Sequence, residues 1–167
     1  VKFVFSGQVN KTRGLEECVD KLIEVCDFDF IVKVASPSDC TDLITKHSCV
    51  EFVGHLCPMG LEELYADVDV GLVSLQPAME TPGFPSKTFD YVRAALPIIY
   101  FGPRLDAYEN IISSHLGATI LTKQTEPLKL DEIFARHSER NVIKFEEAVC
   151  FTESSKVALL KILRAFA

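Results

Sequence analysis

The chain has 167 residues, of which 48% are hydrophobic and 25% charged, and its formal net charge is −7. This length suits one domain with a sizeable core, and the acidic balance argues against a nucleic-acid ligand, because phosphate binding requires a basic face. No apolar run reaches the roughly 20 residues of a membrane span, and no signal-peptide pattern is present.

The six cysteines and four histidines follow none of the spacings typical of metal sites, and no CxxC pair occurs. Disulfide frameworks belong mostly to short secreted chains, so we expect reduced, mostly buried thiols in a cytosolic protein. The sequence therefore predicts no metal site and no cofactor.

Short apolar strands alternate with segments of helical periodicity along the chain. In chain order we predict a strand over 1–7, a helix over 15–25, a strand over 28–36, a helix over 39–47, a strand over 49–55, a helix over 60–68, a strand over 69–75, a helix over 86–96, a strand over 97–102, a helix over 106–117, a strand over 118–122, and helices over 130–149 and 154–166.

The predicted strands are apolar throughout, as in a parallel sheet that is covered on both faces. We therefore predict one α/β domain over 1–167, a Rossmann-like, doubly wound parallel sheet of about six strands with flanking helices and right-handed crossovers. Ligands of such sheets bind at the carboxyl ends of the strands, next to helix N-termini. The loops that follow the strands are therefore the candidate binding segments.

The loop after the first predicted strand combines glycines with two cations. It reads SGQVNKTRG over 6–14, which is neither a dinucleotide fingerprint nor a P-loop. Lys11 and Arg13 precede Gly14, where a helix is predicted to begin, so side-chain charge and backbone N–H groups could hold a phosphate. The alternative is an exposed turn with two solvated cations.

The loop over 76–87 reads QPAMETPGFPSK, in which three prolines restrict the backbone and Gly83 offers a bare N–H group. Ser86 is a good N-cap, and Lys87 then lies in the first helical turn, where a cation is unfavourable unless an anion binds beside it. Asp90 shares this helix face and could accept hydrogen bonds from the hydroxyls of a ribose. The alternative for Asp90 is an exposed charge that the helix dipole favours.

The order of these pieces resembles the C-terminal, nucleotide-sugar-binding domain of the retaining GT-B glycosyltransferases, in the large family that builds bacterial polysaccharides. The segments that carry the resemblance are SGQVNKTRGLEECVDKL, VEFVGHLCPMGLEELYADVDVGLVSL, GFPSKTFDYVRAALPIIYFG and the tail FEEAVCFTESSKVALLKIL. The resemblance covers most of the chain and implies that the domain is one half of a GT-B fold.

In the family's first loop, the resemblance implies two cations on the donor diphosphate. After Gly7, these positions hold Gln8 and Arg13, so one cation is an amide here, and Lys11 is a candidate replacement. Gly54 and His55 lie where the family places the nucleotide base. The alternative for Gly54 is a glycine that only allows the chain to turn.

The family's two glutamates, seven residues apart, fall at Pro82 and Asp90, so Asp90 is implied to bind the ribose. Glu80 is a nearby stand-in for the glutamate that Pro82 replaces. Further implied contacts with the nucleotide-sugar are Gly83, Phe84, Ser86 and Lys87, with Arg13 and Lys87 as the catalytic cations.

The implied reaction transfers a sugar, with retention and without a metal, from a nucleotide-diphosphate sugar to a glycan or lipid-linked acceptor. The chain opens within a predicted strand and without Met, so we expect a piece of a larger cytoplasmic protein. Acceptor binding and any membrane association would belong to an N-terminal domain, so this piece alone should not catalyse transfer. The sequence leaves open a nucleotide-sugar 2-epimerase and a non-catalytic nucleotide-binding or interaction domain.

Overall fold

The computed structural model describes residues 1–80, 83–121 and 126–142, so the predicted helix over 154–166 lies outside the described residues. Strands and helices alternate as predicted. The elements are β1 (Lys2–Ser6), a short 3₁₀ helix η1 (Lys11–Arg13), α1 (Leu15–Val25), β2 (Ile31–Ala35), α2 (Thr41–Lys46), β3 (Val50–Gly54), α3 (Pro58–Ala66), β4 (Val70–Ser74), α4 (Lys87–Arg93), β5 (Ile98–Phe101), α5 (Asp106–Leu116), β6 (Thr119–Ile120) and α6 (Leu130–Ser138).

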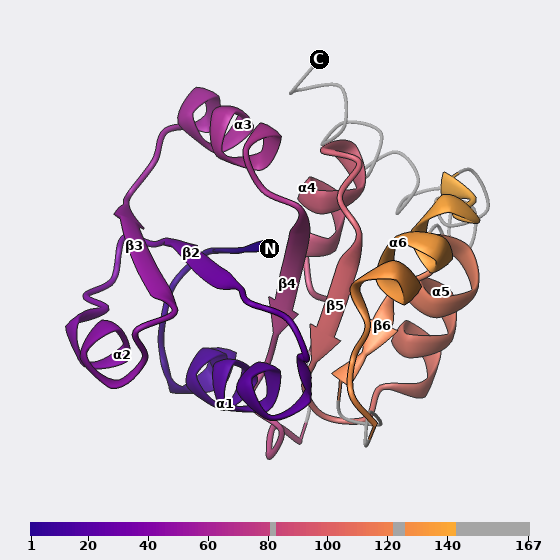
Figure 1. Cartoon of the computed structure of the whole chain (residues 1–167), viewed down its shortest axis with the longest axis horizontal. Coiled ribbons are helices and arrows are strands. Elements are labelled where there is room, and N and C mark those ends of the chain that lie inside the picture. The colour runs from indigo at the N-terminus through magenta and orange to yellow at the C-terminus, as the bar shows by residue number, and fades with distance from the viewer. Residues whose placement is uncertain (81–82, 122–125, 143–167) are drawn as a thin grey trace.

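The strands form one six-stranded sheet in the order β3-β2-β1-β4-β5-β6, and every pair is parallel. Figure 1 shows the helices on both sides of this sheet, with α1 and α2 on the side away from α3. The predicted Rossmann-like, doubly wound α/β fold is therefore confirmed. None of the described helices is long and apolar enough to cross a membrane.

The hydrophobic core has two halves, one on each face of the sheet, because successive strand residues point to opposite faces. Phe3 and Phe5 of β1 pack with α1, α2 and α6, whereas Val4 between them packs with α3, α4 and α5. Gly71 of β4 lies under the ring of Tyr91, where an added Cβ would come within 2.5 Å of the ring. A side chain at Gly71 would therefore push α4 away from the sheet.

Three predicted boundaries are wrong by three residues or more. The helix predicted over 86–96 ends at Arg93. The strand predicted over 28–36 begins only at Ile31. The helix predicted over 130–149 ends at Ser138 within its described part, because the chain leaves the helical ladder there: the amide of Asn141 donates to the carbonyl of His115 instead.

The five cysteines in the described residues carry free thiols. Cys18 and Cys40 are buried, Cys26 and Cys49 are half-buried, and Cys57 is exposed. Burial raises the pKa of Cys26 to about 12, so this thiol is protonated at neutral pH. Cys57 is therefore the most accessible of the five.

Candidate functional site

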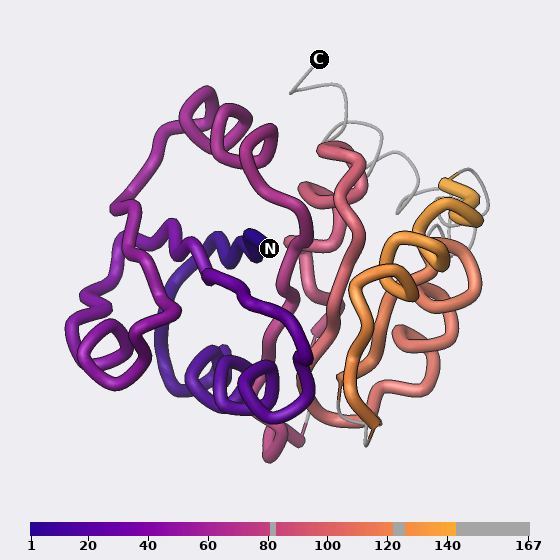
Figure 2. Tube along the Cα trace, viewed as in Figure 1, coloured from indigo at the N-terminus to yellow at the C-terminus, as the bar shows by residue number. Residues whose placement is uncertain are grey.

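The strand order reverses direction between β1 and β4, which are neighbours in the sheet but far apart in the sequence. Figure 2 shows the first half of the chain on one side of this point and the second half on the other. A small cavity of about 60 Å³ lies at the carboxyl ends of these two strands. It is lined by Phe5, Ser6, Gly7, Arg13, Leu72, Val73, Ser74, Pro85, Ser86 and Lys87.

The loop after β1 is held against the end of β4 by backbone contacts. The side chain of Asn10 accepts a hydrogen bond from the amide of Thr12 (3.1 Å), and the carbonyl of Thr12 accepts one from the amide of Gln76 (2.9 Å). Gly14 lies so close to this segment that an added Cβ would come within 2.8 Å of the carbonyl oxygen of Leu75. These contacts position the preceding residue, Arg13, at the cavity.

The polar groups around the small cavity suit an anion. Arg13 and Lys87 both line it, and they come from different elements, η1 and α4. Ser74 also lines it, and its side chain is 3% exposed and finds no hydrogen-bond partner for Oγ among the described residues. Two cations beside an unpaired hydroxyl are the donors that a phosphate group binds.

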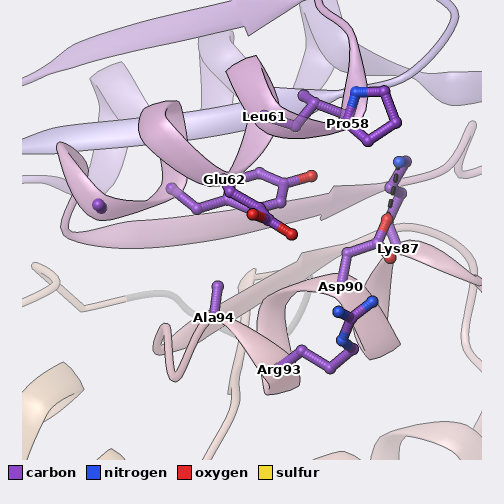
Figure 3. A pocket seen from close by; sticks show the side chains of 9 residues that line it. Pro58, Leu61, Glu62, Lys87, Asp90, Arg93 and Ala94 are labelled. Atoms are coloured by element: carbon purple, nitrogen blue, oxygen red, sulfur yellow. Dashed lines mark hydrogen bonds and ion pairs between the residues drawn. The ribbon is translucent and has the colours of Figure 1, made fainter. Parts of the chain in front are cut away.

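A second pocket of about 510 Å³ lies between α3 and α4. Its size is that of a typical small-molecule site. Lys87 lines both the small cavity and this pocket, where its Nζ forms an ion pair with Oδ2 of Asp90 at 2.8 Å. Figure 3 shows the labelled residues of the two helices around the pocket: Pro58, Leu61, Glu62, Lys87, Asp90, Arg93 and Ala94.

A buried network of hydroxyl groups joins this pocket to the end of β1. Tyr65 lines the pocket, and its hydroxyl lies 2.7 Å from Oγ of Ser6. The amide of Ser6 donates to the hydroxyl of Tyr91 (3.2 Å), which in turn donates to the carbonyl of Val4 (3.2 Å). Burial raises the pKa of Tyr65, so its hydroxyl is a neutral donor and acceptor at neutral pH.

The start of α4 differs in one respect from the prediction. The helix begins at Lys87, directly after Ser86, as expected. Ser86, however, has helical backbone angles and makes no capping hydrogen bond with its side chain. The first turn is instead closed by backbone bonds, from the amide of Thr88 to the carbonyl of Pro85 and from that of Phe89 to Ser86. Ser86 therefore precedes the helix as predicted, but the prediction that its side chain caps the helix is wrong.

The structure brings only some of the other predicted site residues to these two cavities. Gly7 lines the small cavity, but the exposed Gln8 lines neither. Lys11 lines a separate pocket of about 510 Å³, among acidic side chains of α1 and the loop before α2. Gly54 and His55 line neither of the two cavities around Lys87.

The loop between β4 and α4 contributes less than predicted in its described part. Glu80 and Gly83 are exposed and line neither cavity, and Pro82 lies outside the described residues. Phe84 packs on other aromatic rings, stacked on Phe89 at 5.3 Å and edge-on to Tyr108 at 5.0 Å between centroids. Phe84 therefore anchors the loop on α4 and α5.

Sequence reasoning missed several polar residues that the fold brings to these cavities. Ser6 and Ser74 are the last residues of the apolar strands β1 and β4, and this placement is a signal that the sequence contains. Tyr65 fits the apolar period of the helix predicted over 60–68, and this pattern does not indicate a polar role. Glu62 has no signal in the sequence, because only the packing of α3 beside α4 brings it to the pocket.

No protein-family model matches the chain, and no curated protein matches it. Among solved structures, the chain is similar to the crystal structure of a GtfA/B complex, with a TM-score of 0.57 at 15% identity over 99% of this chain and 36% of that chain. This likeness shows the fold alone: the chain has a glycosyltransferase-like fold. It spans about a third of the length of the solved structure.

Two further solved structures match more loosely. The glycosyltransferase GlyE of Streptococcus pneumoniae TIGR4 has a TM-score of 0.43 at 14% identity, over 84% of this chain and 32% of that chain. The pneumococcal O-GlcNAc transferase GtfA, in complex with UDP and GlcNAc, has a TM-score of 0.48 at 15% identity, over 99% of this chain and 32% of that chain.

Proposed function

We propose that this chain is the donor-binding domain of a retaining GT-B glycosyltransferase, which moves a sugar from a nucleotide-diphosphate sugar to a glycan or lipid-linked acceptor. The observation that carries the proposal is the small cavity between β1 and β4, which is lined by Arg13, Lys87 and Ser74, whose Oγ has no hydrogen-bond partner among the described residues. The glycosyltransferase-like fold of the chain supports it.

In this proposal the diphosphate of the donor binds at the small cavity and its nucleoside in the larger pocket. Lys87 lines both, so it is suited to the phosphates at their junction. Asp90, in the larger pocket, accepts hydrogen bonds from the ribose once Lys87 turns toward the phosphates. Arg13 and Lys87 then stabilise the negative charge that develops on the leaving diphosphate.

Acceptor binding belongs, in this proposal, to a separate domain of the full-length protein. The chain spans 36% of the length of the GtfA/B structure that it matches. We therefore expect the 167-residue chain to bind the donor but to show no sugar transfer by itself. Transfer at a normal enzymatic rate by this chain alone would contradict the two-domain assignment.

The test is calorimetric binding of UDP, GDP and ADP, with and without attached sugars, to the wild-type chain and to Lys87→Met. Losing a charge-assisted hydrogen bond costs about 1.5–3 kcal/mol, so the variant should bind about ten- to a hundredfold more weakly. Lys21→Met is a matched control, because Lys21 forms a similar i,i+3 ion pair with Glu24 at 2.9 Å on α1. The control should bind as the wild type does.

Inorganic diphosphate separates the two parts of the proposed site. Asp90→Asn should weaken nucleotide binding without weakening diphosphate binding, because the carboxylate contacts only the nucleoside part. If Asp90→Asn weakens the binding of nucleotide and of diphosphate equally, the assignment of Asp90 to the ribose is wrong. If none of the three nucleotides binds at millimolar concentration, the proposed function is wrong and a non-catalytic interaction domain is the favoured alternative.

A further inference from the structure

We propose that the protein binds a divalent transition-metal ion of the Zn²⁺ type at Glu16, Asp20 and His47. The two carboxylates come from α1, and the imidazole comes from the residue that directly follows α2. Both helices cover the face of the sheet opposite α3 and α4, so this site is separate from the proposed donor pocket.

The fold brings three ligand atoms of the right kind together. Glu16 and Asp20 are four residues apart on α1 and therefore share a helix face. One ligand atom from each of the three residues lies within 4.8 Å of the others, and Nε2 of His47 is 3.6 Å from Oδ1 of Asp20. Ligand bonds of 2.0–2.2 Å around a tetrahedral Zn²⁺ place neighbouring ligand atoms about 3.4 Å apart, so small side-chain movements complete the geometry.

The imidazole of His47 is the observation that points to an ion. The side chain is only 5% exposed, yet its Nε2 has no hydrogen-bond partner among the described residues. Buried polar atoms are nearly always hydrogen-bonded, so an unpaired one requires an explanation. Nε2 lies 3.6 Å from Oδ1 of Asp20, and a ligand atom of Glu16 lies within 4.8 Å of the other two, so a metal ion between these groups satisfies all three.

The ammonium group of Lys46 lies against the two carboxylates that would bind the ion. Its Nζ contacts Oε1 of Glu16 at 2.5 Å and Oδ2 of Asp20 at 3.4 Å. Lys46 is exposed and has a long, flexible side chain, so it can leave the carboxylates when an ion binds. Lys46 therefore competes with the metal ion for the carboxylates of Glu16 and Asp20.

The ligand set selects the class of ion. An imidazole with two carboxylates suits Zn²⁺ or Co²⁺, whereas Mg²⁺ and Ca²⁺ prefer oxygen ligands alone. Three protein ligands leave a fourth position for water. No thiolate belongs to the cluster, so oxidation of the cysteines should leave binding intact.

The test is equilibrium dialysis of the full 167-residue chain against Zn²⁺ alone, in a background of excess Mg²⁺ and with the exposed Cys57 replaced by serine. We expect one Zn²⁺ per chain. Glu16→Gln and Asp20→Asn should each weaken binding by at least about tenfold, since even changes outside the ligand shell cost that much. Glu17→Gln, the same change on the neighbouring residue of α1, should leave the affinity unchanged.

Two further results decide the assignment. Lys46→Met should raise the affinity above that of the wild type, because it removes the competing cation; an affinity at or below wild type would overturn the proposal. Co²⁺ substitution should give the visible absorption of a four-coordinate site, and Asp20→Asn should abolish it. The proposal also fails if Glu16→Gln and Asp20→Asn bind Zn²⁺ as tightly as Glu17→Gln does.

Discussion

Replacing Gly14 with alanine should destabilise the protein by about 2–5 kcal/mol, for two separate reasons. Gly14 has φ of 57°, in the left-handed region, which costs a residue with a Cβ about 1–2 kcal/mol. The new Cβ would also lie 2.8 Å from the carbonyl oxygen of Leu75 and 2.9 Å from the Cα of Gln76. These are backbone atoms, so the loop itself must shift, and such overpacking costs about 1–3 kcal/mol.

Two other glycines separate these contributions. Gly54 has φ of 86°, but no heavy atom lies within 4 Å of an added Cβ, so Gly54→Ala should show the torsional cost alone. Gly83 has neither feature, so Gly83→Ala should have almost no effect or stabilise slightly by restricting the unfolded chain.

The assay is urea unfolding followed by circular dichroism, with the free energies compared at a common slope. The expected order of destabilisation is Gly14→Ala, then Gly54→Ala, then Gly83→Ala. If Gly14→Ala costs no more than Gly54→Ala, the close approach of the first loop to the end of β4 is wrong. The position assigned to Arg13 beside the small cavity would then be wrong as well.

Two further predictions concern buried and paired groups. Tyr91→Phe should lower stability by about 1–3 kcal/mol in urea unfolding, because the buried amide of Ser6 loses its hydrogen-bond acceptor; an unchanged midpoint would contradict the contact. Hydrogen bonds from Lys2 and Lys33 lower the pKa of Asp67 to about 2, so its contribution to stability is complete above pH 4 and disappears as the pH falls through 2. Asp67→Asn should therefore destabilise the protein more at pH 7 than at pH 2, as thermal unfolding at the two pH values would show.

The sequence alone was enough to predict the fold, because the signals for it are local. The central strands of a doubly wound sheet are apolar on both faces, so the patterns of β1 and β4 can be recognised without knowledge of their neighbours, whereas the edge strand β3 has exposed residues. Part of the candidate site can also be predicted from residues that are close in the sequence. Lys87 and Asp90 lie three residues apart on one helix, which predicts that they share a face, and the structure pairs them at 2.8 Å.

Which residues meet across the sheet was decided only by tertiary packing. Lys11 and Arg13 look equivalent in the sequence, but the turn of η1 and the docking of Gly14 on the end of β4 bring Arg13 to the small cavity and Lys11 to another pocket. His47 meets the carboxylates of α1 only because α1 and α2 pack on the same face of the sheet. Residue spacing along the chain does not predict these contacts, because they depend on how separate elements pack against one another and not on the residue pattern within one element.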